Sequence, residues 1–378
     1  MSVAVTKPKP SPSSRLAGAA RPNIRILRPD GMPRPATATE GLSRPSRTGL
    51  LAEAANCLSS AGVTVPTARL LDDPAGVFME AVTHGSSDFA AVLGTVYWTQ
   101  VVEQSKMLPA WIRVVGKKVD APDFREIAHI RLGDMELKKL NETGEIEQVS
   151  IPEGGERWKL ETYAAIFTLS RQLMTNDIDG AIIRAAGNNG RTIGKLEAKV
   201  ATDVLTQNAG LGPMMADGKT CFHADHGNIG DELLDVEGLD AGRKRMRQQK
   251  ALDGETPLNA PPKFLLVPSA LETKAEQVLA ELQPAKVEDT NPFSQKLDLV
   301  VEPRLDAVSE TAWYLLADQM AVESVIYGNL RSAQGPMVEL RPAWEQDGLG
   351  IRVIYDFAAA ITDHQGVYRS SGDAGGGE

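Results

Sequence analysis

The stretch NDIDGAIIRAAGNNGRTIGKLEAKVATDV, residues 176–204, decides how the rest of the chain is interpreted. Asn176 can cap a helix at its start. Seven positions that follow recur at spacings of three and four, which is the pattern of one helix face; they are Ile182, Ala186, Asn189, Ile193, Leu196, Val200 and Val204. The sequence therefore predicts one long helix. Gly187, Gly190 and Gly194 lower the helix propensity of its middle, which leaves a kink or a break there as an alternative.

A helix and then strands are predicted before this long helix. Residues 86–88 offer caps for an apolar stripe at helical spacing over 89–101. Residues 128–132 alternate like a strand, and a long run is expected to place five residues on one face; they are Trp158, Leu160, Thr162, Ala164 and Ile166. Between these strands, residues 134–161 hold eight Asp/Glu, four Lys/Arg and few core candidates. We expect an extended, solvent-reaching β-arm there.

Beyond the long helix the sequence predicts a mixed module. A Gly/Pro/Met loop at 208–218 leads to a basic helix at 239–249 and a buried strand at 263–267. Ser269 and Glu272 have the spacing of a capping box for a helix that runs to Leu282. The remainder is rich in predicted strands, at 297–305, 312–317, 324–330, 337–341 and 350–361. Helices and strands mixed in this way indicate an α+β fold.

The first 48 residues differ in composition from the rest of the chain. They hold eight of the 23 prolines among Ser, Arg, Ala and Thr, and almost no large apolar residues. Such a segment buries too little surface to fold, so we expect it to be disordered. Residues 1–50 carry nine basic and two acidic residues, a net charge of +7. The whole chain is −10, which leaves −17 for residues 51–378. A linker or cleaved leader is favoured over an arm that binds nucleic acid or a partner.

Composition excludes several classes of protein. No stretch approaches the roughly 20 consecutive apolar residues of a membrane-spanning helix, so we expect a soluble protein without membrane contact. The N-terminus lacks the apolar core of a secretory signal. Cys57 and Cys221 are the only cysteines and fit a reducing cytoplasm. A body of charge −17 is a poor nucleic-acid binder, because phosphate contacts need a basic face.

Six stretches resemble one known family in the same order. They are SSDFAAVLG (86–94), PDFREI (122–127), LSRQLMTNDI (169–178), CFHADHGN (221–228), PKFLLVPSALETKAEQVL (262–279) and WYLLAD (313–318). They resemble the Mu-like head-subunit branch of tailed-phage major capsid proteins, some of which are fused behind a prohead protease. The likeness runs from about Thr83 to Gly372. Six stretches in one order are more specific than any single motif.

The resemblance implies the Hong Kong 97 type of capsid fold. This α+β fold has an N-arm, an extended β-arm (E-loop), a peripheral domain with a long spine helix, and an axial domain. The resemblance implies a disordered basic arm at 1–50, the N-arm and a helix at 51–115, the E-loop with peripheral strands at 116–168, the spine helix and loop at 169–234, the axial domain at 235–335, and peripheral closing strands with a flexible tail at 336–378.

The same resemblance implies a structural function. The chain is expected to assemble into pentamers and hexamers of an icosahedral head shell that encloses phage or prophage DNA without sequence-specific binding. Expected partners are a separate scaffold, a prohead protease and a portal. Assembly is expected in the bacterial cytoplasm and the product in the virion. An encapsulin-type compartment shares the fold and is the alternative. No catalytic residue, cofactor or metal is expected.

One cluster offers an alternative of a different class. Cys221, His223 and His226 are zinc-ligand types within six residues and could serve a metal-dependent hydrolase. No second Cys/His pair lies at zinc-site spacing, so we favour a polar turn. In that turn Asp225 and Asn228 make backbone hydrogen bonds and Gly227 is left-handed. The chain also lacks the G-x-S-x-G elbow of serine hydrolases and the phosphate-binding P-loop.

Charged residues supply the candidates for contacts between subunits. The β-arm is expected to lie across a neighbouring subunit, because a lone hairpin buries too little surface to be stable. Its acidic side chains would meet basic patches there. The basic run near 243–247 fits a solvated face or salt bridges to an acidic neighbour better than a DNA contact. The candidates are Glu142, Glu145, Glu147, Glu153, Glu156, Arg243 and Arg245.

Overall fold

The computed structural model describes residues 49–84, 87–107, 110–132, 153–252, 254, 256–280, 296–343 and 347–373. The expected N-terminal arm and most of the β-arm (133–152) lie outside these residues. Within the described residues, helices and strands are mixed along the chain, as an α+β fold requires. None of the described helices is both long enough and apolar enough to span a membrane.

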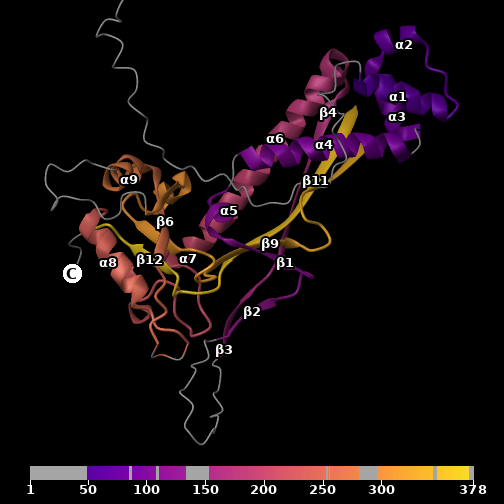
Figure 1. Ribbon diagram of the computed structural model, residues 1–378. Helices are drawn as coiled ribbons and strands as arrows, with labels where there is room; N and C mark the ends of the chain where they lie inside the picture. The colour runs from indigo at the N-terminus through magenta and orange to yellow at the C-terminus, as the bar shows by residue number, and fades with distance from the viewer. Residues whose placement is uncertain are drawn as a thin grey trace, which may run out of the picture.

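Five helices form the N-terminal part of the described chain. The first three make a small helical unit at one end of the molecule, and α4 runs from it along the long helix (Figure 1). The helix expected at 89–101 is thereby confirmed as α4, which begins at Ser87. The helices are α1 (Gly49–Ser60), α2 (Thr67–Asp72), α3 (Pro74–His84), α4 (Ser87–Met107) and α5 (Trp111–Val115).

The long helix α6 spans Arg171–Leu205, 35 residues. The expected cap at Asn176 is wrong, because the hydroxyl of Ser170 caps the helix by accepting a hydrogen bond from the Leu173 amide at 3.3 Å. The helix is not broken at its glycines. Gly190 instead permits a close crossing, because a Cβ there would lie 2.5 Å from the carbonyl oxygen of Val101 on α4. Gly190 is therefore needed for the close packing of α6 against α4, and not to bend α6.

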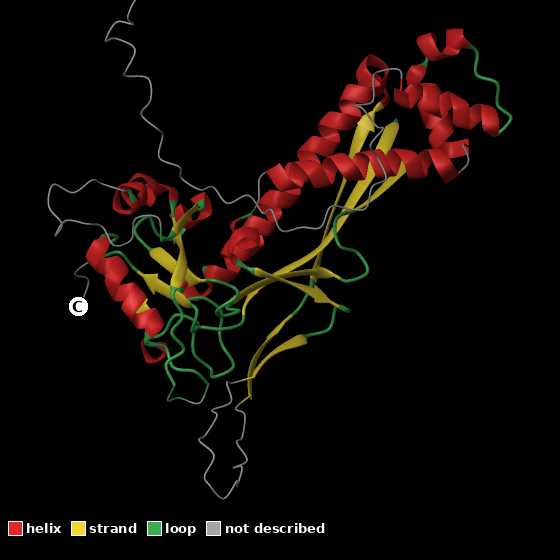
Figure 2. Cartoon of the chain, viewed as in Figure 1, coloured by secondary structure: helices red, strands yellow, loops and turns green. Residues whose placement is uncertain are grey.

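The first sheet lies against α6 and is built around one long strand, β11. Its strand order is β1-β9-β11-β10, and β4 pairs with the other edge of β11 over ten residue pairs. Figure 2 shows the helices running alongside these strands. The inward residues of β11, Leu349, Ile351, Tyr355 and Phe357, join the main core with α6. The strands are β1 (Lys117–Ala121), β4 (Glu161–Ser170), β9 (Val325–Leu330), β10 (Met337–Pro342) and β11 (Gly348–Ile361).

The second sheet has the order β5-β12-β8-β6-β7 and is covered on one face by α8 (Val236–Arg247) and α9 (Glu272–Leu279). Its other face belongs to the main core that α6 also enters. One strand was not expected here: Val367–Ser370 form β12 in this sheet, whereas 336–378 was assigned only to closing strands and a tail. The strands are β5 (Ile229–Gly230), β6 (Pro262–Val267), β7 (Asp298–Val301), β8 (Trp313–Ala317) and β12.

An antiparallel hairpin, β2 (Ile127–Leu132) with β3 (Glu153–Trp158), projects from the first sheet. The prediction that five residues from Trp158 to Ile166 share one face is wrong. The strand breaks after Trp158 and resumes at Glu161. Trp158 and Leu160 are buried in a small core, whereas Ile166 is 72% exposed.

Two further local predictions fail for the same reason, a contact from a distant segment. Ser269 does not cap its own helix, because its hydroxyl bonds to the Asp306 carboxylate, which also accepts from the Ala270 amide at 3.1 Å. A 3₁₀ turn, η3 (Ser269–Leu271), precedes α9. The strand expected over 297–305 ends at Val301, and a second 3₁₀ turn, η5 (Pro303–Ala307), follows and carries Asp306.

Candidate functional site

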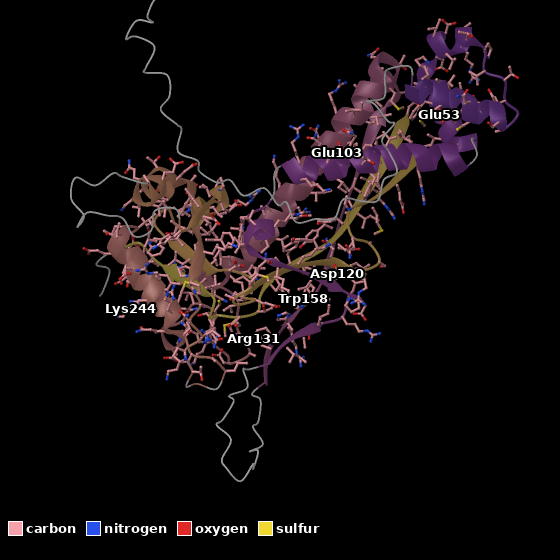
Figure 3. The ribbon with its side chains drawn as sticks, in the orientation of Figure 1. Glu53, Glu103, Asp120, Arg131, Trp158 and Lys244 are labelled. Carbon is pink, nitrogen blue, oxygen red and sulfur yellow. The ribbon has the colours of Figure 1, made fainter. Side chains whose placement is uncertain are left out.

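Several segments that are distant in the sequence meet at the base of the β2–β3 hairpin. Its two faces differ in chemistry, because opposed residues of an antiparallel pair lie on the same side. His129 faces Glu156 on one side, and Ile130 faces Gly155 on the other. Figure 3 shows Trp158 where the hairpin joins the first sheet, and Arg131 nearer to the loops of the second sheet.

Arg131 anchors the hairpin to the turn before β12. Its guanidinium forms an ion pair with Asp363, whose side chain is only 4% exposed, and reaches the Gln365 oxygen at 3.5 Å. Gln365 in turn donates to the carbonyl oxygen of Lys250 at 2.6 Å. A buried carboxylate needs such a partner, since an unpaired buried charge is costly. The hairpin is therefore held to the second sheet from its polar side.

Two more polar contacts act on the same face. The carboxylate of Glu156 accepts from the Ala216 amide at 2.9 and 3.1 Å, which ties β3 to the loop after α6. His129 lies 3.5 Å from Glu323, and that carboxylate also pairs with Lys117 of β1. Three segments of the chain thus hold the polar face, so the base of the arm is packed against its own subunit and does not reach into solvent.

Trp158 fixes the other end of the hairpin. Its side chain is buried against Gly328 of β9, where a Cβ would lie 2.5 Å from the indole ring. Glycine is required at 328 because the ring occupies the space of a side chain. The large buried aromatic and the polar contacts together define the direction in which the hairpin leaves the body.

The outward face of the hairpin exposes a large apolar side chain. Ile130 is 64% exposed, and its neighbours on that face are the exposed residues Ala128 and Gly155. A sheet with one solvated face normally turns its polar residues outward. Arg157, opposite Ala128, follows this rule and pairs with Glu126 at 3.5 Å, whereas the isoleucine does not.

Cys221, His223 and His226 form a turn with separate hydrogen bonds. The Cys221 thiol is fully buried, and burial raises its pKa well above the ordinary value. His223 caps η2 (Ala224–His226) by accepting from the Asp225 amide at 3.1 Å. Within the described part of the chain, no three His, Cys, Asp or Glu side chains are placed to hold a metal ion.

The expected polar turn is confirmed in two of its three details. Gly227 is left-handed, with φ of 63°, and Asn228 donates to the carbonyl oxygens of Cys221 at 2.8 Å and His364 at 3.1 Å. Asp225 does not bond to the backbone with its side chain, because that carboxylate takes Lys219 at 2.6 Å. His223 takes the backbone contact instead.

His226 joins this turn to its surroundings. Its ring stacks on His364 with centroids 3.9 Å apart, Nδ1 lies 3.0 Å from the carbonyl oxygen of Cys221, and Nε2 lies 2.7 Å from the Asp217 carboxylate. The hydrogen bond from His226 holds the pKa of Asp217 below its usual value. Burial, and the neighbouring His226, lower the pKa of His364 to about 4. The cluster is therefore a polar packing unit beneath the hairpin anchor.

The structure places the seven candidates for contacts between subunits in different surroundings. Glu142, Glu145 and Glu147 lie outside the described residues, and Glu153 begins β3. Glu156 bonds within the subunit, as shown above. Arg243 pairs with Asp240 of its own helix. Arg245 reaches Glu232 at 2.8 Å and the carbonyl oxygen of Ile229, and lies over the Tyr368 ring.

The anchoring residues Arg131, Asp363 and Gln365 were not singled out from the sequence. The partners lie more than 230 positions apart, so no local spacing connects them. The strand pattern around Arg131 was the one local signal that could have identified it. Arg131 alternates with exposed apolar residues in β2, which indicates that its side faces the body.

A family model described as phage capsid protein matches residues 155–370, more than half of the chain. The chain belongs to the phage capsid protein family. This capsid protein is therefore a structural subunit of a shell built from many copies, and a component of the virion. The matched region contains α6, the second sheet, the first sheet without β1, and most of β3 of the anchored hairpin.

Solved structures from three sources show a similar chain path. The chain of Mycobacterium phage Cain is 12% identical, with a TM-score of 0.47, over 70% of this chain and 91% of that one. The cyanophage P-SCSP1u capsid is 8% identical, with a TM-score of 0.46, over 68% and 86%. The holo-SrpI encapsulin of Synechococcus elongatus PCC 7942 is 11% identical, with a TM-score of 0.42, over 70% and 86%. The curated proteins include no match.

Proposed function

We propose that this capsid protein is the major head subunit of a tailed phage or prophage, of the Mu-like branch, and that its β2–β3 hairpin is the E-loop of a Hong Kong 97 type fold. The two-sided hairpin carries this proposal. Its inward polar face is bonded to its own subunit, and its outward face leaves Ile130, 64% exposed, for a partner. In a homo-oligomeric shell the partner is a second copy of the chain.

We further propose how the other parts of that fold correspond to the described helices and strands. The first sheet with α6 corresponds to the peripheral domain, and α6 to its spine helix. The second sheet with α8 and α9, mostly within 235–335, corresponds to the axial domain around which pentamers and hexamers form. β9 and β12 show that the chain crosses between the two sheets, so the domains are not contiguous in sequence.

Of the charged contact candidates, those that lie between β2 and β3 in the sequence fit a neighbouring subunit best. Glu142, Glu145 and Glu147 would give register by meeting basic side chains across the interface. Glu156 and Arg245 are already bonded inside the subunit, so they would act by holding their own elements in place. We propose that assembly takes place in the host cytoplasm with a separate scaffold, protease and portal, and that the shell encloses DNA without reading its sequence.

Electron microscopy of Ile130→Asp particles tests the role of the hairpin. We expect the variant subunit to fold normally, since surface substitutions change stability by about 0.5 kcal/mol or less. We expect few closed shells, because a carboxylate would be buried at the contact. Leu71→Asp is the matched control, because Leu71 is 79% exposed and lies on α2, in the helical unit away from the hairpin (Figure 1). Normal shells from Ile130→Asp would show that this face is not a subunit contact.

Hydrogen exchange gives a second, independent measurement. Residues 134–152, between β2 and β3, should exchange fast in free subunits or capsomers and markedly slower in assembled particles. Equal exchange in both states would contradict the proposal. The content of the particles separates the alternatives, because nuclease-protected DNA indicates a phage head and a co-purified protein cargo indicates an encapsulin-type compartment.

A further inference from the structure

The solvent side of α6 carries a continuous basic stripe. Asn188, Arg191, Lys195 and Lys199 are all exposed. Their spacings of three, four and four residues place them on one narrow face, and at about 1.5 Å per residue the stripe is about 16 Å long. Figure 3 shows side chains projecting from the side of α6 that faces away from the strands.

Acidic residues are absent from this stripe. Between residues 182 and 202, all of them described, the only carboxylate is Glu197, and it is 1% exposed and turned inward to Arg113. The helix alongside, α4, adds one exposed acid and one exposed base, Glu103 and Lys106. The stripe is therefore a local exception on a body whose residues 51–378 carry a charge of −17.

The stripe differs from the basic run on α8. On α8, two of the four basic side chains are paired within the subunit, Arg243 with Asp240 and Arg245 with Glu232. On α6, Arg191 makes long contacts, each 3.4 Å, to the carbonyl oxygen of Gly187 and the side-chain oxygen of Asn188, which are neutral groups. The charge of Arg191 therefore remains available to a ligand.

Composition indicates which ligand fits. Protein interfaces have aromatic or apolar centres and are depleted in Lys. The stripe has no exposed apolar side chain; its members and the adjacent exposed Thr192 are Arg, Lys, Asn and Thr. These are the side chains that contact phosphate oxygens without reading bases. A polyphosphate backbone fits this face better than a second copy of the chain does.

We infer that the exposed face of α6 binds the phosphate backbone of enclosed double-stranded DNA, and that this side of the subunit faces the interior of the shell. The inference rests on the proposed function, because it needs a shell that contains DNA. Binding is independent of base sequence and weakens with salt, since it releases condensed counterions. The opposite, strand side of the first sheet then faces away from the DNA.

The test measures binding of the full-length, unassembled chain to a short fluorescent DNA duplex over a range of salt concentrations. The variant is Arg191→Gln with Lys195→Gln and Lys199→Gln. Each lost phosphate contact lowers the slope of log affinity against log salt by about 0.9, so the triple variant should lose close to 3. The basic N-terminal arm is present in every protein compared, so its contribution cancels.

A matched variant removes the same charge elsewhere: Lys244→Gln, Arg247→Gln and Lys250→Gln, on and just after α8. We expect it to bind like the wild type. A charge-preserving variant, Arg191→Lys with Lys195→Arg and Lys199→Arg, should also bind like the wild type, because phosphate contacts need charge more than a particular side chain. An equal loss in the α6 and α8 variants, or no loss in the α6 variant, would overturn the inference.

Electron microscopy of the same variants tests the remaining explanation, which is that the stripe contacts a neighbouring subunit. We expect the α6 variant to form normal shells. Unchanged DNA binding together with lost shells would mean that the stripe contacts a neighbouring subunit, and the inference would be wrong. Wild-type protein that forms no shells would refute the proposed function, whatever the DNA measurements show, so the two failures are distinct.

Discussion

Replacing Glu197 with glutamine perturbs the most buried ion pair among the described residues of α6. Glu197 accepts two hydrogen bonds from Arg113 of α5, each 2.5 Å, and a third of 2.5 Å from the hydroxyl of Tyr355 on β11. The side chain of Glu197 is 1% exposed and that of Arg113 is 19% exposed. The substitution leaves the guanidinium largely buried without a counter-charge.

The expected loss follows from this geometry. Removing one partner of a buried pair costs about 3–5 kcal/mol, because the remaining charge is uncompensated. Arg113 keeps some contact with water, and the glutamine oxygen can still accept one of the three hydrogen bonds. We therefore expect the unfolding free energy to fall by about 3 kcal/mol, at the lower end of that range.

Urea unfolding of the unassembled chain, followed by tryptophan fluorescence, measures this loss. Trp111, Trp158 and Trp313 are each 5% exposed or less, so their emission reports on the cores. The matched control is Asp347→Asn. Its pair with Arg171 has an N–O distance of 2.7 Å and also joins α6 to the start of β11, but the two side chains are 72% and 60% exposed. An exposed pair contributes about 1 kcal/mol or less.

A double variant separates the charge from the packing. Arg113→Met with Glu197→Leu removes both charges at once, and apolar replacements of a buried pair are often neutral. We expect it to be more stable than Glu197→Gln alone. The reasoning is refuted if Glu197→Gln and Asp347→Asn lose the same free energy, or if the double variant is the least stable of the three.

Four further outcomes are expected. Gly190→Ala should lower the unfolding free energy by about 1–3 kcal/mol, because its Cβ would meet a backbone carbonyl of α4 at 2.5 Å. Gly187→Ala should be neutral or stabilising, because the nearest neighbour of its Cβ would lie 3.8 Å away. Urea titrations of the two variants measure both changes. The pKa of His364 is lowered to about 4, so the unfolded chain binds more protons than the folded chain between about pH 6.5 and 4. The unfolding free energy should therefore fall as the pH drops through that window, by at most about 3 kcal/mol. His364→Gln should flatten this dependence in unfolding curves taken at several pH values. Elemental analysis should find no stoichiometric zinc that is lost in Cys221→Ser. Deleting residues 2–48 should leave the melting temperature of the subunit nearly unchanged, and a large drop would count against a dispensable arm.

Features set by local periodicity could be predicted from the sequence. The long helix was predicted because its apolar positions recur at helical spacing, and most of the strands after 310 because of their apolar runs. Helix starts were harder. Asn176 and Ser170 are both good caps, and the choice depends on the strand β4, which ends at Ser170 and turns directly into α6. That choice is tertiary, since β4 is held there by its pairing with β11.

The residues of the candidate site were harder to predict from the sequence, because their contacts also depend on distant segments. Ser269 and Glu272 have the spacing of a capping box, but Asp306, 37 positions from Ser269, takes its place. Arg131 and Asp363 are a stronger example, because neither stands in a motif and only the folded chain brings them together. Residues that hold the hairpin are therefore recognised by burial and contacts, and not by sequence pattern.

The anchored base has a consequence for how a shell subunit of the proposed type would work. If the hairpin joined the body through one flexible point, its direction would be set only on contact with a neighbour, and ordering it would cost conformational entropy at that step. Arg131, Glu156 and Trp158 instead bind it to three different parts of its own subunit. Much of that entropy is already lost in the free subunit, and pre-organisation of this kind strengthens association. The direction of the arm, and with it the angle between neighbouring subunits, is then determined by the fold of each subunit.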